Sequence, residues 1–314
     1  MTSTSSSTHF AVWRAAAFPT RDNRRRSKEL VIQGALFFAA LSSVLITLGI
    51  VSILLYESLS FFQTVPIRRF LTDTQWTPLF ADAHYGILPL ACGTMVTAAV
   101  GCLVALPLGT IVAIYLSEYA PYWVREFGKP FLELLSSVPT VVYGYFALLF
   151  VTPLLQKIIP GLPGFNMLSA GIVIGVMIIP YVSSVSEDAM RSVPMHLREA
   201  SYAAGGTRLQ TALRVVVPPA FSGIASAYIL GFSRAIGETM VVAVAAGMQP
   251  NLTWDPREPA ETITAYIVQV SLGDLPHGSV GYQTIFAAGL TLMLMTLAFN
   301  VAGYFLRKRF REVY

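Results

Sequence analysis

The sequence has few charged residues for a chain of its length. Asp, Glu, Lys and Arg make up 12% of the 314 residues, against roughly 25% in soluble globular proteins. Hydrophobic residue types make up 54%, and the mean hydropathy is +0.62. Because so few charges cannot cover a water-facing surface, the composition predicts a polytopic membrane protein.

The sequence also lacks the motifs of common catalytic sites. Gly128-Lys129 is followed by Pro130, and Trp123 stands where a phosphate-binding loop requires its first glycine. The four histidines are scattered, and neither H-E-x-x-H, a zinc-like Cys/His spacing nor G-x-S-x-G occurs. We therefore expect a chain that is not an enzyme, binds no metal or cofactor and has no nucleotide site of its own.

Cysteine is equally scarce. Cys92 and Cys102 lie in one apolar run, about 15 Å apart if that run is helical. A disulfide needs Cα atoms within roughly 7 Å of each other. The sequence therefore gives no support for redox chemistry.

The sequence contains several long apolar runs between its few charged residues. Runs of about 20 apolar residues can cross a bilayer as helices, and six are predicted, at 30–56, 86–116, 131–155, 166–186, 218–247 and 284–306. The expected fold class is all-α, with a transmembrane domain at 30–311 and a short C-terminal end at 312–314. The first run is too long for a secretory signal and is expected to remain as a span.

The distribution of basic residues predicts the orientation. Most of the 21 Lys and Arg residues fall in the tail at 1–29, in the second and fourth loops and after the last span. By the positive-inside rule, both termini face the cytoplasm. The Ser/Thr-rich tail is predicted to be disordered. The net charge of +4 reflects these loop ends, so lipid is an expected partner and nucleic acid is not.

The outer loop between the last two spans has a helical pattern. Its apolar residues Ile263, Tyr266, Ile267 and Val270 follow a spacing of i, i+3, i+4 and i+7, which predicts a short interfacial helix. The loop is also acidic, with Asp255, Glu258, Glu261 and Asp274. It is either a solvated loop or a docking surface.

The longest cytoplasmic loop, at about 186–217, is predicted to form two short helices. Gly205-Gly206 is expected to end the first, and Thr207 is expected to cap the second. Glu199, Ala200, Ser201, Gly205 and Pro218 then follow the spacing of the EAA loop of ABC importer permeases, which this segment resembles. In that family the loop docks into a groove of a separate ATPase subunit.

Further strings resemble the permeases of the phosphate-specific transport system. They include Pro107-Leu-Gly-Thr, Ile114-Tyr-Leu-Ser-Glu-Tyr-Ala and Arg234-Ala-Ile-Gly-Glu-Thr-Met. The last string favours the C-type over the A-type subunit. The resemblance implies a type I ABC importer permease fold in a bacterial inner membrane and a phosphate pathway shared with an A-type permease. It also implies an ATPase dimer that uses ATP and Mg, and a periplasmic phosphate-binding protein.

Arg234 and Glu238 are the charged residues of the fifth apolar run. Four residues apart in one helix, they would share a face and pair. The pair is either purely structural, or it lies on an anion pathway in which Arg234 contacts the anion and Glu238 holds Arg234 in place.

Small residues recur every four positions along the same run. This spacing lets helices approach closely in lipid and predicts a central, tightly packed fifth span. Gly171 and Gly175 form a weaker example in the fourth span. The residues of the longer run are Gly223, Ala227, Gly231, Ala235, Thr239, Ala243 and Gly247.

Other functions remain open at this stage. A permease for phosphonate or another oxyanion is one alternative, because a guanidinium recognises charge and geometry that many oxyanions share. An ion-coupled secondary anion carrier would instead use Arg234 and Glu238 as a proton relay. A membrane scaffold that recruits a partner through its cytoplasmic loop is a third possibility.

Overall fold

The computed structural model describes residues 23–276 and 278–309. Most of the predicted tail at 1–29 and all of the C-terminal end at 312–314 therefore lie outside the described residues. Within them the chain is helical, and an isolated bridge between Trp76 and Tyr85 is the sole extended pairing. The all-α prediction is confirmed.

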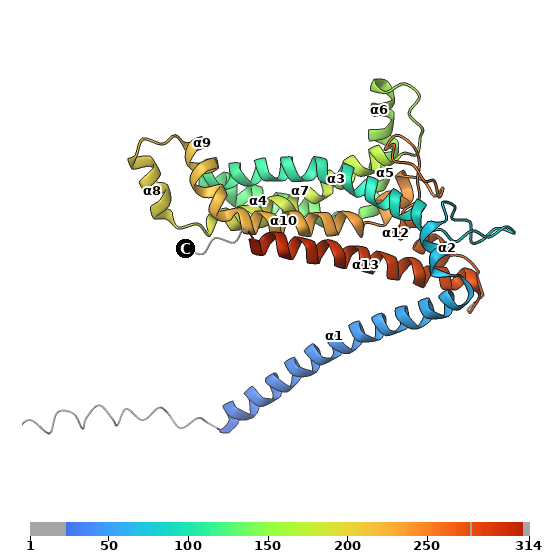
Figure 1. Cartoon of the computed structure of the whole chain (residues 1–314). Coiled ribbons are helices and arrows are strands. Elements are labelled where there is room, and N and C mark those ends of the chain that lie inside the picture. Colours follow the sequence, from blue (N-terminus) through green and yellow to red (C-terminus); the bar gives the residue numbers. More distant parts are fainter. Residues whose placement is uncertain (1–22, 277, 310–314) are drawn as a thin grey trace, which may run out of the picture. The chain divides into compact units, whose positions relative to one another are not determined.

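The chain divides into two compact units, residues 1–53 and 54–314. In the first unit, α1 (Asn23–Thr64) begins as a helix whose apolar side chains are mostly exposed. The second unit holds the end of α1 and all later elements (Figure 1). These are α2 (Ile67–Thr72), α3 (Leu88–Ile114), α4 (Tyr122–Ser137), α5 (Thr140–Phe146), α6 (Thr152–Ile158), α7 (Met167–Arg191), α8 (Met195–Ala203), α9 (Arg208–Thr211), α10 (Val217–Ile236), α11 (Met240–Ala245), α12 (Ile263–Ser271) and α13 (Val280–Arg309).

Three π-helical turns join some of these helices without a break. They are η2 (Tyr115–Tyr119) after α3, η3 (Ala147–Val151) between α5 and α6, and η4 (Ala212–Val216) between α9 and α10. The described residues contain six helical stretches long and apolar enough to cross a membrane, which confirms the predicted number of spans. They are 28–64, 88–119, 140–158, 167–191, 208–236 and 280–305.

The third and fifth spans differ from the predicted ranges. The third was expected from 131, but the helix stops at Ser137, where Val138 is extended and Pro139 has no N–H to donate. A new helix starts at Thr140. The fifth was expected at 218–247, but it begins ten residues earlier, at Arg208, and ends at Ile236. α11 is a separate short helix beyond the break at 237–239.

The core is built on close contact between α3 and α7. A Cβ atom at Gly175 would lie 2.7 Å from the carbonyl oxygen of Gly101, and one at Gly171 would lie 2.6 Å from Val100 Cβ. Such spacing requires glycine at both positions of α7. The glycine pair that looked weak in the sequence therefore lies at a close contact between two core helices.

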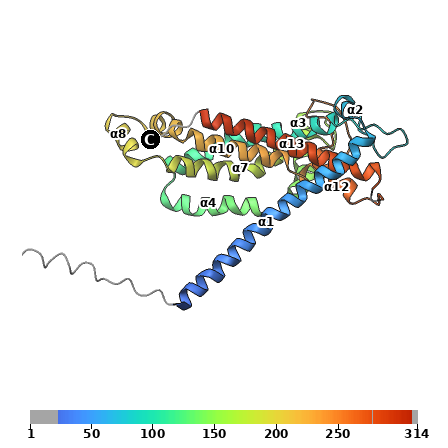
Figure 2. The same cartoon turned by 60° about the horizontal axis from the view of Figure 1, so that its bottom comes forward.

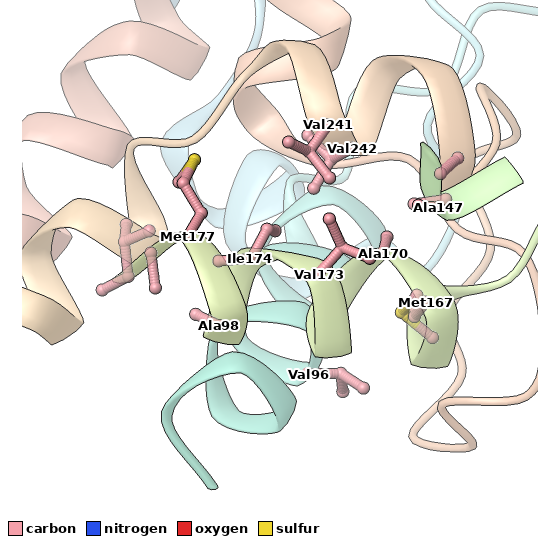
Figure 3. Close-up of a cluster of buried hydrophobic side chains, with 14 of the residues drawn as sticks. Val96, Ala98, Ala147, Met167, Ala170, Val173, Ile174, Met177, Val241 and Val242 are labelled. Carbon is pink, nitrogen blue, oxygen red and sulfur yellow. The ribbon is translucent and has the colours of Figure 1, made fainter. Parts of the chain in front are cut away.

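A hydrophobic cluster fills the space beside this contact. Figure 3 shows Ile174 and Val173 of α7 directed towards Val241 and Val242 of α11, with Ala98 of α3 on the other side of α7. All five side chains are buried. The short helix α11 is therefore part of the core, although it is too short to cross a membrane.

The remaining helices pack around this core. α13 runs along α10 and α12, and Ser233 Oγ of α10 donates to Asn300 Oδ1 of α13 over 3.1 Å. Figure 2 shows α4 beside α7. α8 and α9 lie at one end of this bundle, and α2 and α12 lie at the other (Figure 1).

Candidate functional site: a span arginine and a helical loop

Arg234 lies in the last turn of α10, and its side chain is exposed on the surface of this chain. Its guanidinium carbon lies 5.6 Å from the centre of the Tyr181 ring of α7. This distance is within the range of a cation–π contact. Among the described residues no carboxylate forms an ion pair with Arg234. The guanidinium is therefore oriented by an aromatic ring and keeps its hydrogen-bond donors for another partner.

The predicted pairing of Arg234 with Glu238 is wrong. The prediction assumed one continuous helix, whereas α10 ends at Ile236 and Glu238 lies in the break before α11. Glu238 is buried, and its Oε1 accepts from the backbone N–H groups of Met240 and Val241 at 3.2 and 3.4 Å. Its backbone carbonyl accepts from Thr264 Oγ1 at 2.7 Å. Glu238 therefore caps α11 and ties the break to α12.

The small residues of the predicted fifth span lie on both sides of the break between α10 and α11. Gly223 and Gly231 face α7: a Cβ atom would lie 2.3 Å from Ala189 Cβ at the first position and 3.0 Å from Val182 Cγ2 at the second. Ala227 and Ala235 are buried in the same helix. Thr239, Ala243 and Gly247 lie beyond the end of α10, so the expected continuous run does not exist.

The predicted cytoplasmic loop forms α8, a glycine turn, and then α9 and η4, which lead into α10. α8 ends at Ala203, and Gly205 follows with a φ of +83°, which a residue with a Cβ rarely adopts. Thr207 caps α9 as predicted, in a capping box with Gln210. The predicted second short helix is not separate, however, because α9 continues through η4 into α10.

The residues of the EAA-like motif have different environments. Glu199, Ala200, Gly205 and Pro218 are exposed. The half-buried Ser201 hydroxyl lies 2.8 Å from the buried Thr211 hydroxyl and links α8 to α9. Glu199 and Ala200 thus form an open surface, while Ser201 holds the two helices together.

Sequence reasoning missed an ion pair that attaches this loop to the helix bundle. The guanidinium of Arg198 in α8 binds the carboxylate of Glu118 in η2, with Nη2 2.9 Å from Oε1 and Nε 3.1 Å from Oε2. Arg198 also donates to the carbonyls of Val193 and Met190. Both side chains are less than 10% exposed. Eighty residues separate the partners, and no local sequence pattern connects them.

A second missed cluster fixes α4 to α7. Glu187 of α7 is fully buried, and its Oε2 accepts from Lys129 Nζ at 3.0 Å. Lys129 also donates to Asp188 at 2.6 Å, and Arg191 Nη1 lies 3.4 Å from Glu187 Oε1. Burial acts to lower the pKa of Lys129, but its hydrogen bonds to Asp188 and Glu187 outweigh burial and raise it. The charge cluster therefore joins the two helices near the same end of the bundle as α8.

Comparisons with known proteins agree with this architecture. Residues 105–312 match the family described as binding-protein-dependent transport system inner membrane component. A probable ABC transporter permease, YqgH of Bacillus subtilis, is 36% identical over 92% of this chain and 94% of its own length. The phosphate transport system permease PstC of Mesorhizobium japonicum is 33% identical over 86% of this chain and 88% of its own length.

Solved structures share the fold at lower sequence identity. A chain of a bacterial ABC transporter involved in import of the polysaccharide alginate is 16% identical, with a TM-score of 0.61 over 90% of this chain and 99% of that chain. A chain of the MetNI methionine ABC transporter is 18% identical, with a TM-score of 0.52 over 72% of this chain and 95% of that chain. With its six spans and its family match, this chain belongs to the inner-membrane permease components of binding-protein-dependent ABC transport systems.

Proposed function

We propose that this chain is the C-type permease subunit of an ATP-driven importer of inorganic phosphate. It forms the translocation pathway together with a related A-type permease. A separate ATPase dimer drives transport with ATP and Mg, and a periplasmic phosphate-binding protein delivers the anion. Relatives named as phosphate transport permeases match this chain over most of its length, which supports phosphate as the substrate.

The environment of Arg234 is the observation that carries the proposal. Because no carboxylate among the described residues pairs with Arg234, no opposite charge offsets its guanidinium, and the planar fork of that group suits phosphate oxygens. The Tyr181 ring orients the guanidinium without neutralising it. Because Arg234 is exposed on this chain, we place it where the second permease would complete the pathway.

The exposed surface of α8 is the proposed contact with the ATPase. Glu199 offers a carboxylate to a basic partner, and the small side chain of Ala200 allows close approach. Gly205 provides the turn after α8, and Pro218 lies in the first turn of α10. A conformational change of the ATPase would be transmitted to the membrane spans through α8. The chain itself binds no nucleotide in this scheme.

Uptake of labelled phosphate with and without this gene tests the function as a whole. We expect the deletion to abolish phosphate uptake that depends on ATP and resists competition by phosphonate. Uptake that survives ATP depletion at intact membrane potential would identify an ion-coupled carrier instead. Stronger competition by phosphonate or another oxyanion than by phosphate would reassign the substrate.

Substitution of Arg234 tests the pathway. We expect Arg234→Ala to reduce uptake at least tenfold while the importer still assembles, because the anion loses its fixed positive charge. Glu238→Gln is the matched control, since a Gln carbonyl can still accept from the N–H groups of Met240 and Val241. Normal uptake by Arg234→Ala, or an equal loss in both variants, would exclude the pathway role of Arg234.

Substitution of Gly205 tests coupling. Gly205 and Gly278 both have φ near +80° and open space around the position of a Cβ. Alanine should therefore strain both turns by a similar amount. We expect Gly205→Ala to lower the phosphate transported per ATP hydrolysed, and Gly278→Ala to leave this ratio unchanged. Equal ratios in the two variants would exclude a special role for the turn after α8.

A further inference from the structure

A pocket of about 240 Å³ lies at the end of the bundle opposite α8. Its wall comes from the segment after α2, the segment after α11 and α12, and it includes Trp76, Phe80, Gln249, Glu261 and Tyr266. The volume is far larger than the roughly 30 Å³ occupied by a water molecule. It is smaller than the roughly 300 Å³ at which pockets for drug-sized ligands begin. The size suits one side chain or one small organic ion.

Glu261 is the charged residue of this wall, and within the part of the chain that the structure describes no residue pairs with its carboxylate. The residue is 1% exposed, and its Oε1 is buried without a hydrogen bond. Among the described residues that line the pocket, none is Lys, Arg or His. An isolated buried carboxylate is strongly unfavourable, because it has lost water and gained no counter-charge. Accordingly, burial raises the pKa of Glu261 to about 7.

The backbone holds Glu261 firmly at this position. Its N–H donates to the Gln249 carbonyl at 2.9 Å, and a Cβ atom at Gly93 of α3 would lie 2.4 Å from its carbonyl oxygen. The next residue, Thr262, caps α12 through the N–H of Ala265. Three segments therefore fix the backbone of Glu261 beside the pocket.

The rest of the wall is suited to an organic cation. Trp76 and Tyr266 pack edge to face with their ring centres 5.0 Å apart, and Phe80 is exposed beside them. Aromatic faces attract guanidinium and ammonium groups. The Trp76 and Tyr266 rings are buried, and the exposed ring of Phe80 is available for this contact. Trp76 Nε1 is also buried without an acceptor, and a free amine could not satisfy it. A protein segment supplies both a basic side chain and carbonyl oxygens, so it can satisfy both groups.

We propose that this pocket receives an arginine or lysine side chain of the protein that docks on this end of the bundle, and that Glu261 pairs with it. The identity of that protein rests on the proposed function, in which it is the phosphate-binding protein. The proposal also resolves the choice left open by the acidic outer loop. Asp255 pairs with Arg257 within the loop, and Asp274 is exposed, whereas Glu261 is buried and lacks a cation.

The first experiment measures the affinity of the phosphate-binding protein for the importer in nanodiscs. We expect Glu261→Gln to weaken binding roughly tenfold or more, as loss of a buried interfacial charge pair does. Asp274→Asn removes the same charge from the same end and is expected to change the affinity less than twofold. One Arg or Lys of the binding protein should show a loss on substitution to Ala that disappears in the Glu261→Gln background.

The second experiment needs no partner protein and uses methylguanidinium as the probe. Titration into the full chain in nanodiscs should give a saturable change in tryptophan fluorescence. The change should be absent in Glu261→Gln and in Trp76→Phe, and present in Asp274→Asn. No saturable change in the unsubstituted chain would overturn the cation pocket.

The two experiments separate the pocket from the proposed function. Methylguanidinium binding without any binding of the phosphate-binding protein would retain the pocket and refute phosphate delivery by that protein. Normal affinity for the binding protein in Glu261→Gln would refute the docking role, whatever the probe does. Loss of both signals in Glu261→Gln, with both retained in Asp274→Asn, is the result that we expect.

Discussion

At the scale of single residues, the ion pair of Arg198 and Glu118 has the clearest energetic consequence. We expect Arg198→Ala to lower the free energy of unfolding by about 3–5 kcal/mol, because it leaves the buried Glu118 carboxylate without its counter-charge. Thermal unfolding in detergent measures this loss. Arg208→Ala removes an exposed arginine close in sequence and should have little effect. Equal losses would contradict a special role for the pair.

Glu261 makes a second prediction, about pH. Its pKa is about 7 in the folded chain and 4.5 ordinarily, so the folded state holds a proton that the unfolded state releases. Stability is therefore greatest below about pH 4.5, falls as the pH rises to 7, and is constant above that pH. The total loss is about 3 kcal/mol. The other titratable group close to Glu261 is Tyr266, which stays neutral throughout this range.

Unfolding midpoints measured from pH 5 to 8 test this prediction. The unsubstituted chain should lose stability up to pH 7, whereas Glu261→Gln should show a flatter profile because an amide does not titrate. Asp274→Asn should retain the decline. A decline of the same size in Glu261→Gln would assign the pH dependence to another group.

Sequence reasoning at this scale worked where the signal was local. Thr207 with Gln210 three residues later is a capping box, and the structure confirms the cap. It failed where partners were distant or a helix was assumed to continue. Glu118 is eighty residues from Arg198, and the Arg234–Glu238 pair required helical geometry across Gly237, where α10 ends.

At the scale of helices, the contact between α3 and α7 decides which glycines can be replaced. We expect Gly175→Ala to destabilise the chain by about 1–3 kcal/mol, because the new methyl group would lie 2.7 Å from the Gly101 carbonyl oxygen. Gly49→Ala meets no atom within 4 Å and should be neutral or slightly stabilising, since alanine is the better helix former. Thermal unfolding of both variants checks the contrast. Equal unfolding temperatures of the two variants would mean that α3 and α7 can move apart to fit the methyl group at no cost in stability.

Hydrophobicity predicted the number of spans because crossing the bilayer requires length and apolar character. It did not predict where the helices break. Pro139 lies inside an apolar run, so hydropathy shows no change where α4 ends. The helix ends there because proline has no backbone N–H to donate. The break before α11 has no proline, and α11 begins after it with a cap from Glu238. Hydropathy does not detect a cap made by a buried acid.

At the scale of the whole molecule, the proposed orientation can be tested by cysteine labelling. Cys92 and Cys102 are both buried, so the chain should give a low background with a membrane-impermeant maleimide. We expect Asp274→Cys to react in intact spheroplasts and Thr207→Cys to react only after permeabilisation. Both positions are exposed and lie at opposite ends of the bundle. The reverse pattern would overturn the proposal that both termini face the cytoplasm.

Composition was sufficient for the class of the molecule, because few charges and long apolar runs are physical requirements of a membrane domain. It could not predict how the spans contact one another. The regular small-residue run predicted a tightly packed fifth span, and Gly223 and Gly231 do pack closely against the fourth span. The sequence did not show that Gly175 of the fourth span would meet Gly101 of the second. Contacts between spans depend on which faces meet, and hydropathy and residue spacing along the chain do not show this.

The pairing of α3 with α7 has a consequence for biosynthesis. α3 ends at Ile114 and α7 begins at Met167, so at about 5–20 residues per second a ribosome needs several seconds to supply the partner helix. During that interval α3 must remain in lipid without its partner. Its hydroxyl groups allow this, because Thr94, Thr97 and Thr110 each donate to a carbonyl four residues earlier in the same helix. α3 can therefore remain in the bilayer, with these three hydroxyl groups hydrogen-bonded, until α7 is inserted.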